Sequence, residues 1–294
     1  MEIASKIKVD CAGEPEMPIP KEIFRNLNIS YQEAFSKAEA MTEIAKILRK
    51  SDGFCKIPFC VTTEAEAFGA EVIFNENAPA PFVSGNYCRK ISEIDSIPEI
   101  DLSAGRIAEV LKAVAKLDAE DEQVILNVEG PLTILGLLTG SRNLYRGLLR
   151  TPDKIQELCE QITENLLLYL QEAVRQGIRM ISYADPTVAY DVISDQLYRN
   201  VCGKITYDFL KKYQTAEIPC PVHLCNRTSV GFATSGFCTP VPILVPEGIT
   251  YAEALHYVIK YHPDVHIIGH GCLLRSDKKM KVNHIFQIKL ADSL

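Results

Sequence analysis

Two short motifs in this chain combine a histidine and a cysteine at a spacing that a metal site could use. His223 and Cys225 form the first motif, and His270 and Cys272 form the second; each ends an apolar run typical of a strand. Residues i and i+2 of a strand point to the same face, so each motif can direct an imidazole and a thiolate to one point. Two such strand ends that meet in space would supply up to four soft ligands, the set that selects Zn²⁺.

The motifs are also open to simpler interpretations. The chain has 6 histidines and 10 cysteines, so some of them lie close together by chance. Four ligands would make a closed, structural zinc site, whereas three would leave a position for substrate. His270 is the ambiguous member: it fits a fourth ligand that substrate displaces, a donor to a ligand, or an ordinary polar residue at a strand end.

The elements that must position these motifs alternate between strands and helices from residue 31 onward. Apolar periodicity and short apolar runs predict them. The expected helices are 31–50, 62–69, 107–117, 132–138, 142–149, 151–176, 195–213 and 251–261, and the expected strands are 54–60, 123–128, 178–183, 219–224, 241–245 and 265–269. Residues 279–290 fit a helix or a strand, and residues 75–102 look like a surface excursion.

The pattern of the strands favours a (β/α)₈ TIM barrel. Each strand is nearly all apolar and is followed by a helix, which indicates parallel pairing with helices outside. No glycine-rich phosphate-binding sequence follows a strand, which argues against a dinucleotide-binding fold. Residues 31–294 are therefore expected to form one barrel domain behind an irregular N-terminal extension, residues 1–30. Functional groups of such a barrel lie at the carboxyl ends of its strands.

Composition excludes several classes of partner. The net charge is −7 and no basic cluster is present, so nucleic acid and anionic membranes are poor partner choices. No run approaches the ~18 apolar residues of a membrane span, and the first residues contain no apolar signal core. We therefore expect a cytoplasmic protein whose cysteines are thiols rather than a disulfide framework.

Four runs resemble the uroporphyrinogen decarboxylase superfamily, and within it the methylcobamide:coenzyme M methyltransferases. They are PFCVTTEAEAFGAEV (58–72), VEGPLTILGLLTG (128–140), ISYADPTVAYDVIS (181–194) and VHLC (222–225). The resemblance covers roughly residues 30–272. It implies a uroporphyrinogen decarboxylase-like barrel, a zinc ion, and methyl transfer from a corrinoid to a thiol such as coenzyme M or homocysteine. Because no corrinoid-binding module is recognisable here, the corrinoid is expected to arrive on a small partner protein or unattached.

The resemblance also assigns residues. His223, Cys225 and Cys272 fall on the family's His-x-Cys…Cys zinc set. Glu64 falls in the family's Thr-x-Glu-Ala-Glu run, and Asp185 falls on its Asp-Pro turn. These carboxylates are candidate catalytic groups, although an acidic first helical turn and a turn-initiating aspartate explain them equally simply. Tyr183 and Tyr190 lie near the expected rim, where they would line a cofactor cleft or simply pack.

Three departures from the family pattern shape the expected function. Residues 1–30 contain a single arginine, Arg25, where decarboxylases carry an arginine-rich run that binds substrate carboxylates. The stretch between Cys225 and Cys272 is short, which indicates a trimmed or irregular βα unit near the C-terminus. The glycine that usually follows the first cysteine is absent. The alternatives to a thiol methyltransferase are a decarboxylase-like lyase and a non-catalytic protein that binds a corrinoid partner and holds structural zinc.

Overall fold

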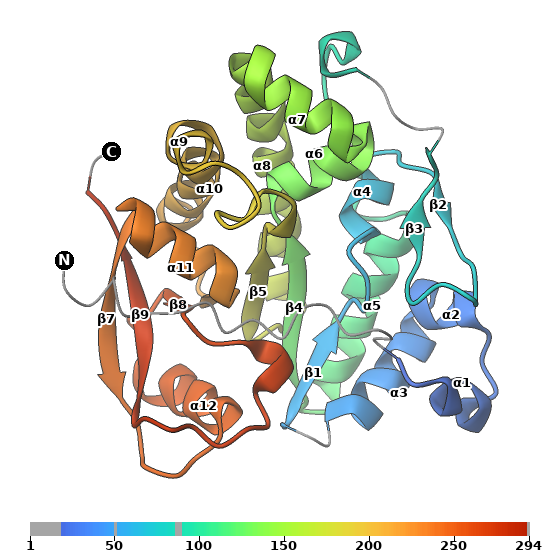
Figure 1. Cartoon of the computed structure of the whole chain (residues 1–294). Coiled ribbons are helices and arrows are strands. Elements are labelled where there is room, and N and C mark those ends of the chain that lie inside the picture. The colour runs from blue at the N-terminus through green and yellow to red at the C-terminus, as the bar shows by residue number, and fades with distance from the viewer. Residues whose placement is uncertain (1–18, 50–51, 86–89, 293–294) are drawn as a thin grey trace.

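This computed structural model describes residues 19–49, 52–85 and 90–292. Its centre is a sheet of seven strands in the spatial order β1-β4-β5-β6-β8-β9-β7 (Figure 1). The strands are β1 (Phe54–Ile57), β4 (Gln123–Glu129), β5 (Met180–Ala184), β6 (Val222–Leu224), β8 (Ile267–Gly269), β9 (His284–Leu290) and β7 (Cys238–Leu244). The first five in that spatial order pair in parallel. A separate antiparallel ribbon joins β2 (Val72–Ile73) to β3 (Phe82–Val83).

The helices alternate with these strands, as expected for an α/β protein with a TIM-barrel-like arrangement. They are α1 (Lys21–Leu27), α2 (Tyr31–Ser36), α3 (Ala38–Leu48), α4 (Thr63–Ala67), α5 (Gly105–Ala119), α6 (Pro131–Thr139), α7 (Ser141–Arg150), α8 (Pro152–Arg175), α9 (Asp195–Leu197), α10 (Gly203–Thr215), α11 (Asn226–Ser235) and α12 (Tyr251–Tyr261). Short 3₁₀ turns lie at η4 (Ile91–Glu93), η5 (Pro186–Val188) and η7 (Leu273–Arg275), and η6 (Tyr198–Cys202) is a π-helix. None of the described helices is long and apolar enough to cross a membrane.

Alternation along the parallel strands separates two cores. Ile181 on β5 and Val222 on β6 belong to the outer core, where α5, α8 and α10 cover the sheet. Met180 on β5 and Ile268 on β8 face the other way, into a smaller inner core. Because successive side chains of a strand point to opposite faces, the polar residue His223 on β6 lies on this inner face as well.

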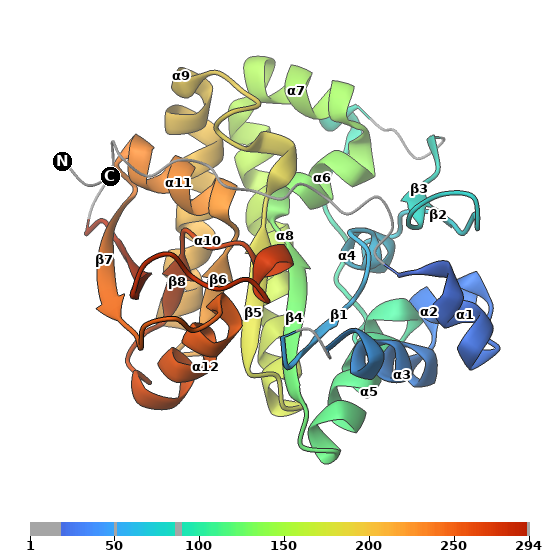
Figure 2. The same cartoon turned by 60° about the horizontal axis from the view of Figure 1, so that its bottom comes forward.

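The helix α12 fills the inner face of the sheet instead of covering its outside. Its residues Leu255 and Val258 are buried in the inner core beside Met180 and Phe54 of the parallel strands. The His256 ring stacks on the Phe54 ring of β1 with centroids 3.9 Å apart. Figure 2 shows α12 on the opposite side of the strands from α8 and α10. The helix thereby fills the smaller core on the inner face of the sheet.

The C-terminal part corrects the expected pattern of eight parallel strands. β9 pairs antiparallel with both β8 and β7, so β9 is reversed and the other six strands of this sheet run in one direction. Among the described residues β1 and β7 do not pair, so the sheet has two open edges, one at β1 and one at β7. Pro240 and Pro242 lie in the edge strand β7; since proline has no N–H to donate, they suit a strand with an unpaired side.

The open edge at β1 is covered by the segment that follows β8. Lys56 on β1 donates to the backbone oxygen of Leu273 at 3.0 Å and to Ser276 Oγ at 3.0 Å. The same ammonium pairs with Asp52, whose carboxylate also accepts a hydrogen bond from Ser276. These contacts hold the segment after β8 against the edge strand β1 through side chains.

The structure also corrects the N-terminal expectation and two helices, of which the one expected over 31–50 is divided into α2 and α3 by Lys37 in an extended conformation. Residues 19–30 were expected to be irregular, but α1 occupies Lys21–Leu27 and buries Ile23 against Phe35 and Ile44. Most of the remaining extension, residues 1–18, lies outside the described residues. The helix expected over 195–213 is interrupted by the π-helix η6.

Candidate functional site

A cavity of about 670 Å³ opens at the carboxyl ends of the parallel strands. It is lined by residues of β1, β4, β5 and β6 and by the segments that follow β1, β5, β6 and β8. His223, Cys225 and Cys272 all line it. This cavity lies within the volume range of small-molecule sites, ~300–1,000 Å³. Three of the four residues singled out by the two motifs therefore face one space.

His223 brings a neutral imidazole to this cavity. Its side chain is 1% exposed, and burial lowers its pKa to about 3. Nε2 lies 2.9 Å from the Tyr251 hydroxyl, while Nδ1 has no hydrogen-bond partner among the described residues. Metal-bound histidines are neutral and commonly hydrogen-bond through the nitrogen that does not ligate. His223 matches this description.

Cys225 lies where the chain turns from β6 into α11. It is the N-cap residue of that helix, and its Sγ accepts from the Thr228 amide at 3.4 Å and lies 3.0 Å from Thr228 Oγ1. A helix N-terminus favours negative charge. The thiolate is the form of cysteine that binds metal.

Cys272 follows β8 and is held by the segment that covers the edge of β1. The preceding residue, Gly271, lies against the phenol end of Tyr251, and any side chain at that position would overlap it. This contact explains the glycine in the second motif. The three residues Leu273, Leu274 and Ser276 that come after Cys272 line the same cavity.

The donor set fits a zinc ion in chemistry. It offers one imidazole with a partnerless buried nitrogen and two thiols, and three protein ligands leave a fourth position open. No three histidine, cysteine or acidic side chains of the described residues are already gathered at ligand distance. The donors share a cavity, and metal binding requires their side chains to converge further.

His270 is placed differently from its partners in the motifs. It adopts a left-handed backbone conformation with φ of 61°, held by the Ser229 hydroxyl on its amide and by Asn226 on its carbonyl oxygen. Its ring packs edge-on against Phe286, and it is not among the residues that line the cavity. Burial lowers its pKa to about 4. A ligand role for His270 remains a prediction.

Glu64 is buried in the first turn of α4 and does not line the cavity. Burial raises its pKa to about 7, against the opposing influence of nearby backbone amides and the Arg106 guanidinium. A carboxyl group with such a pKa suits proton exchange near neutral pH. Its catalytic role remains a prediction.

The raised pKa predicts a pH dependence of stability. The folded protein holds the Glu64 proton more tightly than the unfolded chain does, so the free energy of unfolding falls as pH rises from about 4.5 through 7. Glu64→Gln should stabilise the protein at pH 8 by on the order of 2 kcal/mol and leave it nearly unchanged at pH 4. Urea unfolding at both pH values tests this, with the exposed Glu71→Gln as control. Equal effects of the two substitutions would contradict the prediction.

Asp185 connects β5 to the start of α6. Its Oδ1 accepts from the Thr133 amide at 2.7 Å and from the Thr133 hydroxyl at 2.6 Å, which caps that helix from another part of the chain. Burial raises the pKa of Asp185 to about 6, and the Thr133 hydrogen bonds oppose the shift. The cap is a structural role for Asp185. Its catalytic role remains a prediction.

The two tyrosines that were expected near a cofactor cleft lie away from the cavity lining. Tyr183 points to the outer core and stacks on Phe209 with ring centroids 4.9 Å apart. Its neighbours Ser182 and Ala184 line the cavity instead, as strand alternation requires. Tyr190 packs edge-on against Tyr198. Cofactor binding by Tyr183 and Tyr190 remains a prediction.

Two features of the site were not singled out in the sequence. Tyr251 touches His223, and nothing in the sequence relates a helix N-terminus to a strand 28 residues earlier. Cys60 lines the cavity and accepts from the buried Arg106 guanidinium at 3.2 Å. Its position at the end of the expected strand 54–60 was a usable signal for it.

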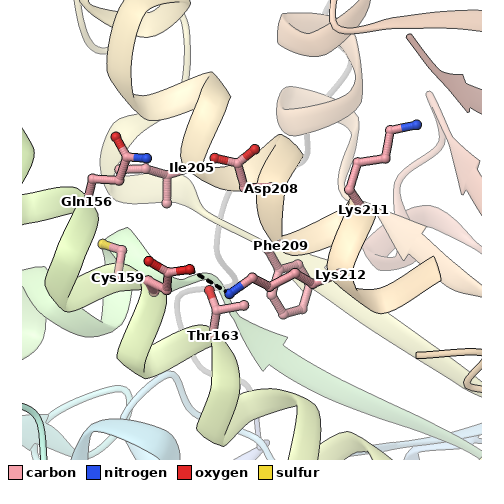
Figure 3. A pocket seen from close by; sticks show the side chains of 9 residues that line it. Gln156, Cys159, Thr163, Ile205, Asp208, Phe209, Lys211 and Lys212 are labelled. Carbon is pink, nitrogen blue, oxygen red and sulfur yellow. Dashed lines mark hydrogen bonds and ion pairs between the residues drawn. The ribbon is translucent and has the colours of Figure 1, made fainter. Parts of the chain in front are cut away.

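A second, smaller hollow of about 210 Å³ lies between α8 and α10 (Figure 3). Lys212 forms an ion pair with Glu160 there at 2.8 Å, beside Asp208 and the buried Cys159. None of the motif residues lines this hollow. The site chemistry therefore belongs to the larger cavity.

Comparison with known proteins finds that the chain is similar to methylcobamide:CoM methyltransferases. The chain is 27% identical over 214 residues to methylcobamide:CoM methyltransferase MtbA of Methanosarcina mazei, covering 69% of this chain and 61% of that protein. It is 22% identical over 222 residues to methylcobamide:CoM methyltransferase MtaA of Methanosarcina barkeri, covering 74% and 65%. The chain thus spans less than two thirds of the length of these relatives.

A solved structure shows the same fold, and a family model shows the family. The structure of a methyltransferase from Methanosarcina mazei superposes with a TM-score of 0.64 at 20% identity, covering 79% of this chain and 68% of that one. The family model for uroporphyrinogen decarboxylase (URO-D) matches residues 19–236, which include His223 and Cys225 and end just before β7. The chain belongs to the uroporphyrinogen decarboxylase family.

Proposed function

We propose that this protein is a zinc-dependent methyltransferase that moves a methyl group from a methylated corrinoid to a thiol such as coenzyme M or homocysteine. One observation carries the proposal: His223, Cys225 and Cys272 line a single cavity at the carboxyl ends of the strands. The relatives named as methylcobamide:CoM methyltransferases support it. Because these relatives are named as methyltransferases, we expect this protein to be an enzyme.

Different residues of the cavity have different roles in the proposed reaction. His223, Cys225 and Cys272 would hold the zinc ion, which supplies the positive charge that favours loss of the proton from an acceptor thiol. Phe59, Val61 and Leu274 give the cavity apolar walls that exclude water from a thiolate. A thiolate without its hydration shell is the stronger nucleophile toward a methyl group.

The methyl donor stays at the mouth of the cavity. A volume of about 670 Å³ suits a drug-sized molecule, and a corrinoid is far larger. We infer that the corrinoid, carried by a small partner protein, presents its methyl group from outside. In the transfer a sulfur–carbon bond forms and the cobalt–carbon bond breaks, and its electron pair remains on cobalt as Co(I).

The lining of the cavity does not favour porphyrinogen decarboxylation. Such a substrate carries several carboxylates, which call for a group of arginines. Arg227 is the one arginine among the lining residues that the structure describes, and it pairs with Asp191 at 2.8 Å. Lys56, the other lining cation, pairs with Asp52.

A direct assay tests the proposed activity. Zinc-loaded protein is mixed with methylcobalamin and a panel of thiols, and loss of the methyl–cobalt absorption reports transfer. We expect thiol-dependent loss with the native chain, none with Cys225→Ser, and full activity with Cys220→Ser, a buried thiol outside the cavity lining. Native protein that retains no zinc by elemental analysis, or transfers methyl to no thiol, would refute the proposal.

A further inference from the structure

Tyr251 connects the inner helix α12 to the candidate zinc ligands. Its hydroxyl lies 2.9 Å from His223 Nε2, and the two rings meet edge to face with centroids 5.8 Å apart. We propose that Tyr251 is a positioning residue that fixes the ring orientation and the tautomer of His223 for metal binding. The inference rests on the proposed function, and it concerns a residue beyond the segment 19–236 that matches the family model.

The hydrogen bond to Tyr251 occupies Nε2 of His223 and leaves Nδ1 as the nitrogen available to a metal ion. Nδ1 is buried and has no hydrogen-bond partner among the described residues. A ring nitrogen that binds metal offers its lone pair, so the other ring nitrogen then carries the proton. In the tautomer that suits metal binding, Nε2–H therefore donates to Tyr251 Oη.

The position of the Tyr251 hydroxyl is itself fixed by three contacts. Tyr251 is the first residue of α12, which begins with reciprocal hydrogen bonds between Thr250 and Glu253. Its amide donates to the backbone oxygen of Lys278 at 3.2 Å. Its phenol end lies against Gly271, with no room for a side chain there. The same ring thus contacts the strand of His223 and the segment of Cys272.

The hydroxyl is the part of Tyr251 that packing alone does not require. A phenylalanine at this position would fill the same space against Gly271. Histidines that bind metal commonly donate their other ring N–H to an oxygen, and loss of that oxygen costs ~10–100-fold in metal affinity or activity. Tyr251→Phe therefore separates positioning from packing.

The first test reads the tautomer without metal. Long-range ¹H–¹⁵N NMR of the metal-free full chain labelled in histidine reports which ring nitrogen carries the proton. We expect His223 to be protonated on Nε2 in the native chain and to become a mixture of tautomers in Tyr251→Phe. Tyr257→Phe, on the same helix but packed against Tyr261, should leave the spectrum of His223 unchanged. A native His223 protonated on Nδ1, or a spectrum that Tyr251→Phe leaves unaltered, would overturn the inference.

The second test reads metal affinity by competition with a chromophoric chelator. Tyr251→Phe should bind zinc ~10–100-fold more weakly than the native chain, and Tyr257→Phe should bind it equally well. Equal affinity of Tyr251→Phe and the native chain would overturn the inference. A native chain that binds no zinc refutes the proposed function instead, and the NMR comparison still decides whether Tyr251 orients His223.

Discussion

Replacing Cys272 with serine should lower the zinc affinity of the protein by roughly 100- to 1,000-fold. Apparent binding free energies of about 10–16 kcal/mol for structural zinc are shared among about four ligands, and each factor of ten in affinity is about 1.4 kcal/mol. A serine hydroxyl does not ionise at neutral pH and is a poor replacement for a thiolate. Affinity is measured by chelator competition, and methyl transfer to a thiol should fall with it.

The matched control for this substitution is Cys60→Ser. Cys60 lines the same cavity, is half-buried, and is outside the proposed ligand set. Its loss should leave zinc affinity within about a factor of two, since no ligand is removed. If Cys60→Ser weakens zinc binding as strongly as Cys272→Ser, the ligand set has been assigned to the wrong thiol.

Lys56→Met should destabilise the fold by about 3 kcal/mol. The substitution leaves the Asp52 carboxylate, whose side chain is 3% exposed, without its cation. Breaking a buried ion pair by removing one partner typically costs 3–5 kcal/mol, and the partial exposure of Lys56 places this pair at the low end. The same ammonium holds Leu273 and Ser276 over the edge of β1, so hydrogen exchange at the Ser276 amide should also accelerate.

The double substitution Lys56→Met with Asp52→Asn checks this interpretation. It removes the stranded charge, so it should be less destabilising than Lys56→Met alone in urea unfolding. Lys112→Met, which breaks a surface pair with Glu109, should change the free energy of unfolding by less than about 1 kcal/mol. A double variant that is less stable than Lys56→Met would show that the charge pair is not the cause.

The order of the elements and the first half of the site were predictable from local sequence. Strands were expected to end at residues 128, 183 and 224, where apolar runs stop at polar or turn-forming residues, and they end at 129, 184 and 224. His223 on β6 and Cys225 just after it both line the cavity, as their spacing predicted, and their role as metal ligands remains a prediction. The α/β class and the family, both confirmed, were also expected from local runs of sequence.

Long-range packing decided what the sequence left open. The apolar stripe of 251–261 predicts a helix, but it does not specify which face of the sheet the helix covers, because both faces are apolar. Tyr183 was placed near the rim for the same reason: alternation says that it opposes Ser182, and only the pairing of Ser182 with His223 fixes which of the two faces inward.

By itself the sequence determined a barrel-like α/β protein and brought His223 and Cys225 together, since both depend on periodicities of a few residues. The reversed direction of β9, the inner position of α12 and the separation of His270 from the cavity lining were decided by tertiary structure. The inner position of α12 depends on apolar burial between segments far apart in the chain, such as Phe54 and Leu255. The hydrogen bond between Lys56 and Ser276 spans 220 residues, and no local pattern encodes it.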